Sequence, residues 1–268
     1  MSAVRPPAVA GMFYPADPRQ LERDVRRYLA DAQPQAFHPK ALIAPHAGYI
    51  YSGAIAASAY ATLKTIAPRI RRVILLGPTH RVAVNGLALP DADAFDTPLG
   101  RIPLDTDAMR AIEKLPQVIV SGEAHEEEHS LEVQLPFLQS VLGEFTLLPL
   151  AVGMATAEEV AEVLEAVWGG EETLIVISSD LSHYLSYAAA QFVDNKTAQD
   201  IIKLQQPIHH EQACGGTPIS GLIVAARKHH LQPHLLDLRN SGDTAGSRDR
   251  VVGYAAFAFT GEKNHVQH

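Results

Sequence analysis

Residues 40–51, K-A-L-I-A-P-H-A-G-Y-I-Y, combine a short apolar run with a proline, a histidine and a glycine. The apolar run predicts a buried strand, and Pro45 and Gly48 predict that this strand ends in a loop. His46 then stands at the carboxyl end of the strand. Because ligands of open α/β sheets bind beyond the carboxyl ends of the strands, His46 is a candidate site residue.

The same pattern occurs twice more along the chain. Residues 72–80, R-V-I-L-L-G-P-T-H, place His80 after an apolar run, and residues 174–183, L-I-V-I-S-S-D-L-S-H, do the same with Asp180 and His183. A single histidine after a strand indicates little. Three of them predict that polar loops from three strands converge on one site.

The composition limits the class of protein. The chain has 268 residues, of which 47% are hydrophobic and 19% charged, and its formal net charge is −8. These values indicate a globular protein with a sizeable core. Lysine and arginine do not cluster in the sequence, so we expect neither nucleic acid nor a membrane surface as a partner.

Cysteine use and hydropathy bear on the compartment. Cys214 is the one cysteine in the sequence, so no intrachain disulfide can form and a reducing compartment is expected. The N-terminal residues lack the apolar region of a signal peptide, and no apolar run reaches the roughly 20 residues of a membrane span. We therefore expect a cytoplasmic protein.

Strand and helix patterns alternate along the chain, which predicts an α/β fold. Amphipathic spacing and caps predict helices over 18–31, 52–66, 105–115, 156–168, 187–205 and 218–230, with a polar and then helical segment at 124–142. Apolar runs predict strands over 41–44, 73–76, 86–89, 118–120, 145–149, 173–177, 233–239 and 250–259, with a loop at 91–100. We expect one domain over residues 1–268: a central, mostly parallel or mixed sheet flanked by helices, with an irregular segment at 1–15 and a flexible tail at 261–268.

His46 and His80 are candidate metal ligands, because neutral imidazole binds first-row metals readily. Each follows a strand and a proline, at equivalent ends of two strands that we expect to be adjacent. The alternative for each histidine alone is a hydrogen bond to a loop carbonyl.

Asp180 and His183 pair a carboxylate with an imidazole. Asp180 is a candidate to orient His183 or to bind a metal, and His183 is a candidate general base. The alternative is that Asp180 and the two preceding serines only cap a following helix.

Residues 125–132, H-E-E-E-H-S-L-E, concentrate two histidines and four carboxylates. His125 and His129 are four positions apart, so they share one face if this segment is helical. One interpretation makes His129 a catalytic residue with Glu128 beside it. The other is an acidic, solvated helix start that complements the helix dipole.

Two further positions have open interpretations. Cys214 precedes Gly215 and Gly216 and then a predicted helix, so it is either a thiol with a depressed pKa beside an anion-binding nest or a small buried residue. Asp243, in N-S-G-D-T, is either an oxygen ligand or part of a turn.

Several long motifs together resemble the Memo family, whose prokaryotic members are called AmmeMemoRadiSam system protein B. The motifs are R-P-P-A-V-A-G-M-F-Y-P at 5–15, A-P-H-A-G-Y-I-Y-S-G at 44–53, L-G-P-T-H at 76–80, E-H-S-L-E-V-Q-L-P-F-L at 128–138, I-S-S-D-L-S-H-Y at 177–184, C-G-G-T-P-I at 214–219, N-S-G-D-T-A-G at 240–246 and V-V-G-Y-A-A at 251–256. The resemblance implies a fold related to the class III (LigB-type) extradiol dioxygenases.

The resemblance also implies a ligand set. Those dioxygenases hold non-haem Fe(II) with two histidines and a carboxylate, which match His46, His80 and a third ligand, while His183 matches their acid/base histidine. Eukaryotic Memo proteins bind copper or iron and supply a cysteine from a C-terminal loop. In that region this chain has Asp243, which would restore a carboxylate ligand, and Cys214 matches a different family cysteine.

The first hypothesis for function is therefore a metal-binding protein, with Fe(II) as the first choice and Cu or Zn as alternatives, that acts as an oxidoreductase on an unknown small molecule. The resemblance implies radical-SAM and AMMECR1-type pathway partners. Two other hypotheses stay open: a non-catalytic module that binds peptides or phosphopeptides in the same crevice, and a metal-assisted hydrolase that uses His129 and its neighbouring glutamate.

Overall fold

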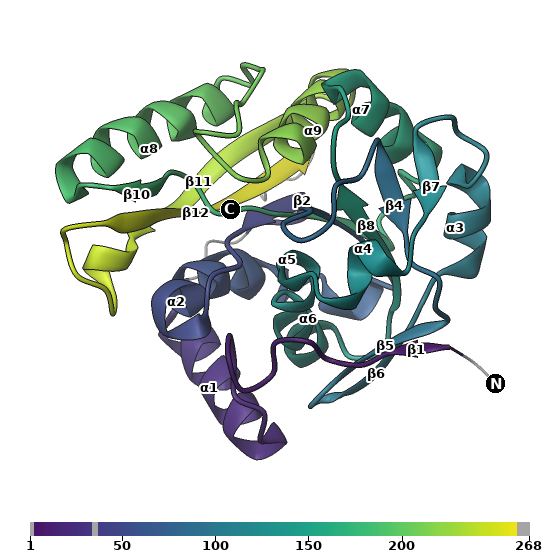
Figure 1. Cartoon of the computed structure of the whole chain (residues 1–268), viewed down its shortest axis with the longest axis horizontal. Helices are drawn as coiled ribbons and strands as arrows, with labels where there is room; N and C mark the ends of the chain where they lie inside the picture. The colour runs from purple at the N-terminus through teal and green to yellow at the C-terminus, as the bar shows by residue number, and fades with distance from the viewer. Residues whose placement is uncertain (1–2, 34–36, 262–268) are drawn as a thin grey trace.

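A mixed β-sheet forms the centre of the molecule (Figure 1). The computed structural model describes residues 3–33 and 37–261, and in this part of the chain the sheet has nine strands in the order β10-β12-β2-β9-β3-β8-β4-β7, with β11 also paired to β12. The strands are β2 (Pro39–Ala44), β3 (Arg72–Pro78), β4 (Leu87–Leu89), β7 (Val118–Val120), β8 (Thr146–Val152), β9 (Thr173–Ser178), β10 (His183–Leu185), β11 (Leu231–Asn240) and β12 (Val251–Gly261).

Four central strands, β2, β9, β3 and β8, are parallel. Their carboxyl ends therefore lie at one edge of the sheet, as the repeated strand-then-histidine pattern predicts. The expectation that the two strands before His46 and His80 are adjacent is wrong, because β9 lies between β2 and β3. Strands β2 and β3 therefore leave room for one strand between them, and β9, which comes later in the chain, occupies that place.

Helices cover both faces of this sheet (Figure 1). On one face lie α1 (Pro18–Asp31), α2 (Tyr49–Tyr60), α4 (Glu123–Glu126), α5 (His129–Glu132) and α6 (Leu135–Leu142); on the other lie α3 (Thr106–Ile112), α7 (Ala157–Ala166), α8 (Tyr187–Ile202) and α9 (Gly216–Lys228). Strand β3 shows why both faces are needed: Val73 and Leu75 pack into one core, and Ile74 and Leu76 into the other. A strand buried on both sides has a continuous apolar sequence.

Capping residues set two helices where the sequence predicts them. Helix α1 begins after Asp17, whose carboxylate accepts the Gln20 N–H at 2.7 Å. Helix α7 begins after Thr156, and Glu159 completes a capping box with bonds in both directions.

Two local predictions are wrong. Helix α2 begins at Tyr49 and ends at Tyr60, with short 3-10 turns η1 (Ala61–Leu63) and η2 (Ala67–Arg69) after it. Ser52 therefore lies inside the helix, where its hydroxyl donates to the Ala47 carbonyl at 2.8 Å instead of capping. Residues expected to form a loop at 91–100 contribute instead to strands β5 (Ala94–Thr97) and β6 (Gly100–Pro103), because β5 pairs with β1 (Val4–Arg5) from the N-terminal segment.

The two ends of the chain differ in what the structure describes. Apart from β1, residues 3–15 form turns, bends and isolated bridges. The predicted tail beyond residue 261 lies outside the described residues. Among the described residues, no helix combines the length and apolar character needed to cross a membrane.

Candidate metal centre

His46 lies in the loop that follows β2 and is buried. Its Nδ1 is 2.9 Å from the hydroxyl oxygen of Ser178, the last residue of β9. Its backbone N–H donates to Asp180 Oδ1 at 2.8 Å, and the Ala47 N–H donates to the same oxygen at 3.3 Å. Two adjacent parallel strands thus fix both the main chain and one ring nitrogen of His46, which leaves Nε2 to face the site.

His80 lies two residues beyond β3 and is held by Glu128. One carboxylate oxygen accepts the His80 backbone N–H at 2.5 Å, and the other lies 2.9 Å from Nδ1. Burial alone would raise the pKa of Glu128, but the hydrogen bonds and charge of His80 and the Ser130 N–H outweigh it and hold that pKa at about 2. An ionised Glu128 is an acceptor for an Nδ1 proton of His80, and in the neutral tautomer that carries this proton Nε2 has the lone pair.

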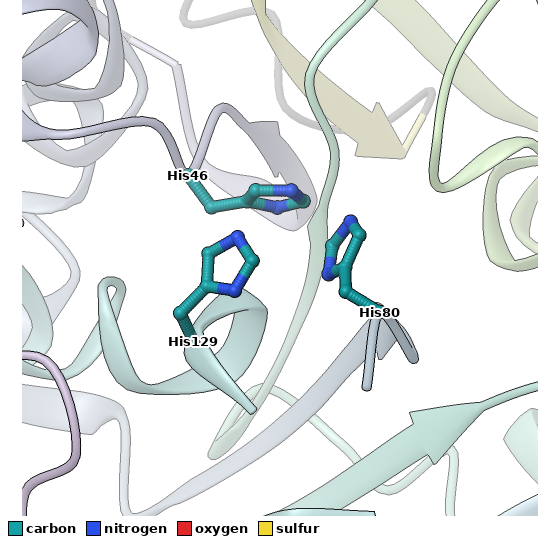
Figure 2. Close-up of side chains that lie close together, drawn as sticks. All are labelled: His46, His80 and His129. Carbon is teal, nitrogen blue, oxygen red and sulfur yellow. The ribbon is translucent and has the colours of Figure 1, made fainter. Parts of the chain in front are cut away.

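His129, the first residue of α5, completes a group of three imidazoles. Figure 2 shows the three rings turned toward one another, from the loops after β2 and β3 and from α5. The ring centroids are 5.2 Å apart for His46 and His80, 5.4 Å for His46 and His129, and 4.5 Å for His80 and His129. One ring nitrogen from each residue lies within 4.8 Å of the others, so the group could hold one metal ion.

The surroundings of His46 and His129 favour the neutral imidazole. Burial, followed by His80, lowers the pKa of His129 to about 4. Burial also lowers the pKa of His46 well below its usual value, with contributions from His80, His129 and His183. Neutral imidazole is the form that binds a metal, so protons compete little for these two residues near neutral pH.

Cys214 borders the group. Its Sγ is 3.3 Å from His46 Nε2, although the two residues are 168 positions apart in the chain. Of the two interpretations of Cys214, the small buried residue fits its environment. The thiol with a depressed pKa does not, because burial, and then Asp180, raise the pKa of the thiol to about 12. A cavity whose lining includes Thr79 and Cys214 adjoins the site.

The two glycines after Cys214 serve close packing. A Cβ on Gly215 would lie 2.7 Å from Ser179 Cβ, and one on Gly216 would lie 2.4 Å from the Ile208 carbonyl oxygen. Protein atoms fill the space beside both residues, which is a sufficient reason for glycine here without an anion nest.

Asp180 and His183 also lie around the site, in different environments. Asp180 is bonded to the main chain of His46 and Ala47 and caps no helix, since β10 follows it. Burial raises its pKa to about 7, against the lowering effect of those N–H groups. His183 is half-buried, and burial lowers its pKa. Its strand is irregular: Tyr184 has φ 60° at a register shift between β10 and β12.

Asp243 lies outside the three-histidine group. It ends the 3-10 turn η3 (Ser241–Asp243), where one oxygen accepts the Tyr187 hydroxyl and the other accepts the Asn240 N–H at 3.0 Å. Of the two interpretations of this segment, the turn accounts for its contacts. The residue beside His46 and His80 is His129, where Asp243 was expected. The catalytic and metal-binding roles of the individual residues stay predictions.

The donors present fit a first-row transition metal. Three imidazoles with one ring nitrogen each within 4.8 Å of the others, and a thiol at the border, match the ligands that Zn, Cu and Fe accept. The hydrogen bonds from Nδ1 of His46 and His80 to Ser178 and Glu128 are the outer-shell contacts that orient metal-binding histidines in proteins.

Sequence reasoning left two contributions to this site unassigned. Glu128 was not connected to His80, although both stand in polar stretches next to apolar runs. Arg5 and Glu132 form a buried ion pair at 2.7 Å beside α5, which no local pattern indicates because 127 positions separate the two residues.

An α/β protein with a histidine cluster at the carboxyl edge of its sheet is the class that the fold and the site define. The sequence model described as "Memo-like protein" matches residues 5–258. MEMO1 family proteins of Sulfolobus acidocaldarius and Aquifex aeolicus are 34% and 35% identical, each over 96% of this chain and 99% of the relative. The chain belongs to the Memo-like family.

The fold recurs among solved structures. The crystal structure of uncharacterized protein JW3007 from Escherichia coli K12 superimposes with a TM-score of 0.52 and 15% identity, covering 80% of this chain and 98% of that one. At this identity the likeness concerns the fold alone. The relation to LigB-type dioxygenases stays a prediction.

Proposed function

We propose that this protein binds one first-row transition metal through His46, His80 and His129 and uses it for oxidation or reduction of a small molecule. The observation that carries the proposal is the group of three ring nitrogens within 4.8 Å at the carboxyl edge of the sheet. The adjoining cavity supports a small molecule as the substrate, since its lining includes Thr79 and Cys214 beside the group.

The residues around the metal have distinct tasks in this proposal. The three imidazoles would hold the ion, and Cys214, 3.3 Å from His46 Nε2, would be a further ligand as a thiolate, with its proton released to solvent. When bound, the metal supplies Lewis-acid activation and, if it is iron or copper, redox chemistry. His183 transfers a proton to or from the substrate, since it is half-buried at the rim and its imidazole is not held by a carboxylate in the described contacts.

The choice of metal follows the family resemblance and the donors. Iron is our first choice, with copper or zinc as alternatives. The carboxylate that would favour iron in a two-histidine site is absent from the group, because Asp243 is engaged by Tyr187 and Asn240. An imidazole-rich set accepts all three metals, so the identity of the ion has to be measured.

The two other hypotheses have less support from the contacts. A hydrolase was expected to use the Glu128 and His129 pair as its base. The two lie 3.4 Å apart, but Glu128 makes shorter contacts with His80, and His129 also faces the other imidazoles. A phosphopeptide module needs several cations at the crevice. Arg81 is the one arginine or lysine among the groups that shift the pKa of His129, so the described residues give a phosphate little positive charge to bind there.

We further propose that the protein works in the cytosol with radical-SAM and AMMECR1-type partners in a modification pathway, as the family resemblance implies. The test is co-purification from the native cell under anaerobic conditions.

A metal titration tests the proposed function. Protein purified without oxygen is titrated with Fe(II), Cu(I) and Zn(II), as wild type and as His46→Ala, His80→Ala and His129→Ala, with Asp243→Ala as the control. The proposal expects each histidine variant to lose at least about 10-fold in affinity and the control to keep the wild-type value. Equal affinity in all five proteins, or tight phosphopeptide binding that survives metal removal, would overturn it.

A further inference from the structure

The N-terminal segment, residues 5–14, crosses the turn between α4 and α5 and is bonded to it by a buried arginine. Arg5 Nε donates to the His125 carbonyl at 2.6 Å, and Nη2 donates to the Glu128 carbonyl at 2.8 Å. Nη1 forms the ion pair with Glu132 at 2.7 Å. One guanidinium thus spans the whole turn that carries Glu128 and His129.

Glu132 connects the same turn to the rest of the segment. Its Oε2 accepts the Ala8 N–H at 2.8 Å, and its Oε1 accepts the Val9 N–H at 3.0 Å and the Tyr14 hydroxyl at 2.5 Å. The side chains of Arg5 and Glu132 are 6% and 0% exposed. A buried carboxylate with four donors is fully satisfied, so removing any of them leaves charge or polar atoms without a partner.

The segment also reaches the imidazoles themselves. The Phe13 ring lies 4.6 Å from the His129 ring, centroid to centroid. The Phe13 carbonyl accepts the Tyr49 N–H at 2.8 Å, and Tyr49 is the residue that begins α2 shortly after His46. The segment therefore contacts the chain beside two of the three histidines.

We propose that the N-terminal segment is an integral part of the metal centre, and that Arg5, Tyr14 and Glu132 are positioning residues that hold Glu128 and His129 in the geometry the metal requires. This inference rests on the proposed metal binding. None of the three residues is a metal ligand or touches the ion; they act through the α4–α5 turn.

Thermodynamic linkage gives the inference a reciprocal form. If ordering of the segment strengthens metal binding, then metal binding must stabilise the ordered segment by the same factor. The Ala8 and Val9 amides, which donate to Glu132, report on the segment, and the Ser130 amide, which donates to Glu128 at 2.9 Å, reports on the turn.

The experiment compares Arg5→Lys and Tyr14→Phe with the wild type. Tyr14→Phe removes only one hydroxyl and keeps the ring. It is the milder variant, and it keeps the test valid if Arg5→Lys fails to fold. Co(II) alone is the probe: its affinity is measured by titration and its site by visible absorption, and amide hydrogen exchange is followed with and without the metal. We expect both variants to lose about 10- to 100-fold in Co(II) affinity with an altered spectrum, and faster exchange at Ser130 in the metal-free protein.

A matched control separates positioning from general stability. Arg72 and Asp105 form another ion pair at 2.5 Å, at the amino end of β3 and so at the opposite edge of the sheet from the histidines. Asp105→Asn should lower the melting temperature and leave both Co(II) affinity and Ser130 exchange unchanged. The inference is overturned if Arg5→Lys and Tyr14→Phe keep wild-type affinity, or if Asp105→Asn weakens it equally.

The two proposals fail in different ways. If the wild type binds no Co(II), the proposed function fails, and Ser130 exchange in the metal-free variants still decides whether the segment holds the turn. If the wild type binds Co(II) and both variants bind it with the same affinity as the wild type, the proposed function stands and the segment has no positioning role.

Discussion

Glu128 shows at the scale of one residue how a buried carboxylate prepares this site. Its carboxylate accepts the main-chain N–H groups of His80 and Ser130 and lies 2.9 Å from Nδ1 of the His80 ring. Asp180 holds the main chain of His46 in the same manner. Each strand histidine thus depends on a carboxylate from another segment: Glu128 holds the main chain and the ring of His80, and Asp180 holds the main chain of His46, whose ring contacts Ser178.

Glu128→Gln should weaken metal binding without unfolding the protein. The amide keeps the shape but loses the charge that holds the proton on His80 Nδ1, and we expect about a 10- to 100-fold loss of affinity. Titration of Co(II) measures it, with the neighbouring exposed Glu127→Gln as the control. Wild-type affinity in Glu128→Gln would mean that the carboxylate does not orient His80.

Sequence reasoning at this scale found His46 and His80 because each follows an apolar run and a proline. It could not decide between two interpretations of His129, since helical spacing and charge describe a solvated helix start equally well. Asp243 was expected at the metal because it is a carboxylate in a loop. Its bonds to Tyr187 and Asn240 depend on tertiary contacts that no local pattern shows.

At the scale of elements, α5 packs closely against the end of β3. A Cβ on Gly77 would lie 2.8 Å from Ser130 Oγ and 3.0 Å from Leu131 Cδ2. The glycine therefore lets α5, and His129 with it, approach the strand that precedes His80.

Gly77→Ala should destabilise the fold by about 1–3 kcal/mol, because α5 must move away from β3 to admit the methyl group. Gly122→Ala is the control: its new Cβ would meet Asp91 Cβ at 3.5 Å, an ordinary contact. Chemical denaturation measures both variants. Equal free energies of unfolding for Gly77→Ala and the wild type would show that α5 does not depend on this close approach.

The elements that carry their own signals could be predicted from the sequence. Helices α1 and α7 have caps, and the central strands have apolar runs between turn residues. Strands β5 and β6 could not be predicted, because β5 is a strand through its pairing with Val4 and Arg5, about 90 positions away in the chain. The strand order was mistaken for a similar reason: the insertion of β9 between β2 and β3 is a tertiary event.

At the scale of the whole molecule, several buried neutral histidines should make the fold sensitive to acid. Burial lowers the pKa values of His125 and His129 to about 4, from 6.5 in the unfolded chain. Between these values the unfolded chain binds protons that the folded chain does not, so the free energy of unfolding falls as the pH falls. Asp180, whose pKa is raised to about 7, acts in the opposite direction.

His125→Gln isolates one of these contributions, outside the three-histidine group. The wild type should lose about 2 kcal/mol more than the variant between about pH 7 and pH 5, from one proton over 1.5 units of pH. Denaturant unfolding at the two pH values measures the difference. Identical pH dependence of the two proteins would show that His125 is not kept neutral by burial.

Anomalous X-ray diffraction from a metal-soaked crystal tests the central claim most directly, since it locates the ion without reference to activity. We predict one strong peak about 2.0–2.3 Å from a ring nitrogen of each of His46, His80 and His129. Absence of a peak among the three imidazoles, or a peak bound instead at Asp243, would contradict the metal centre described above.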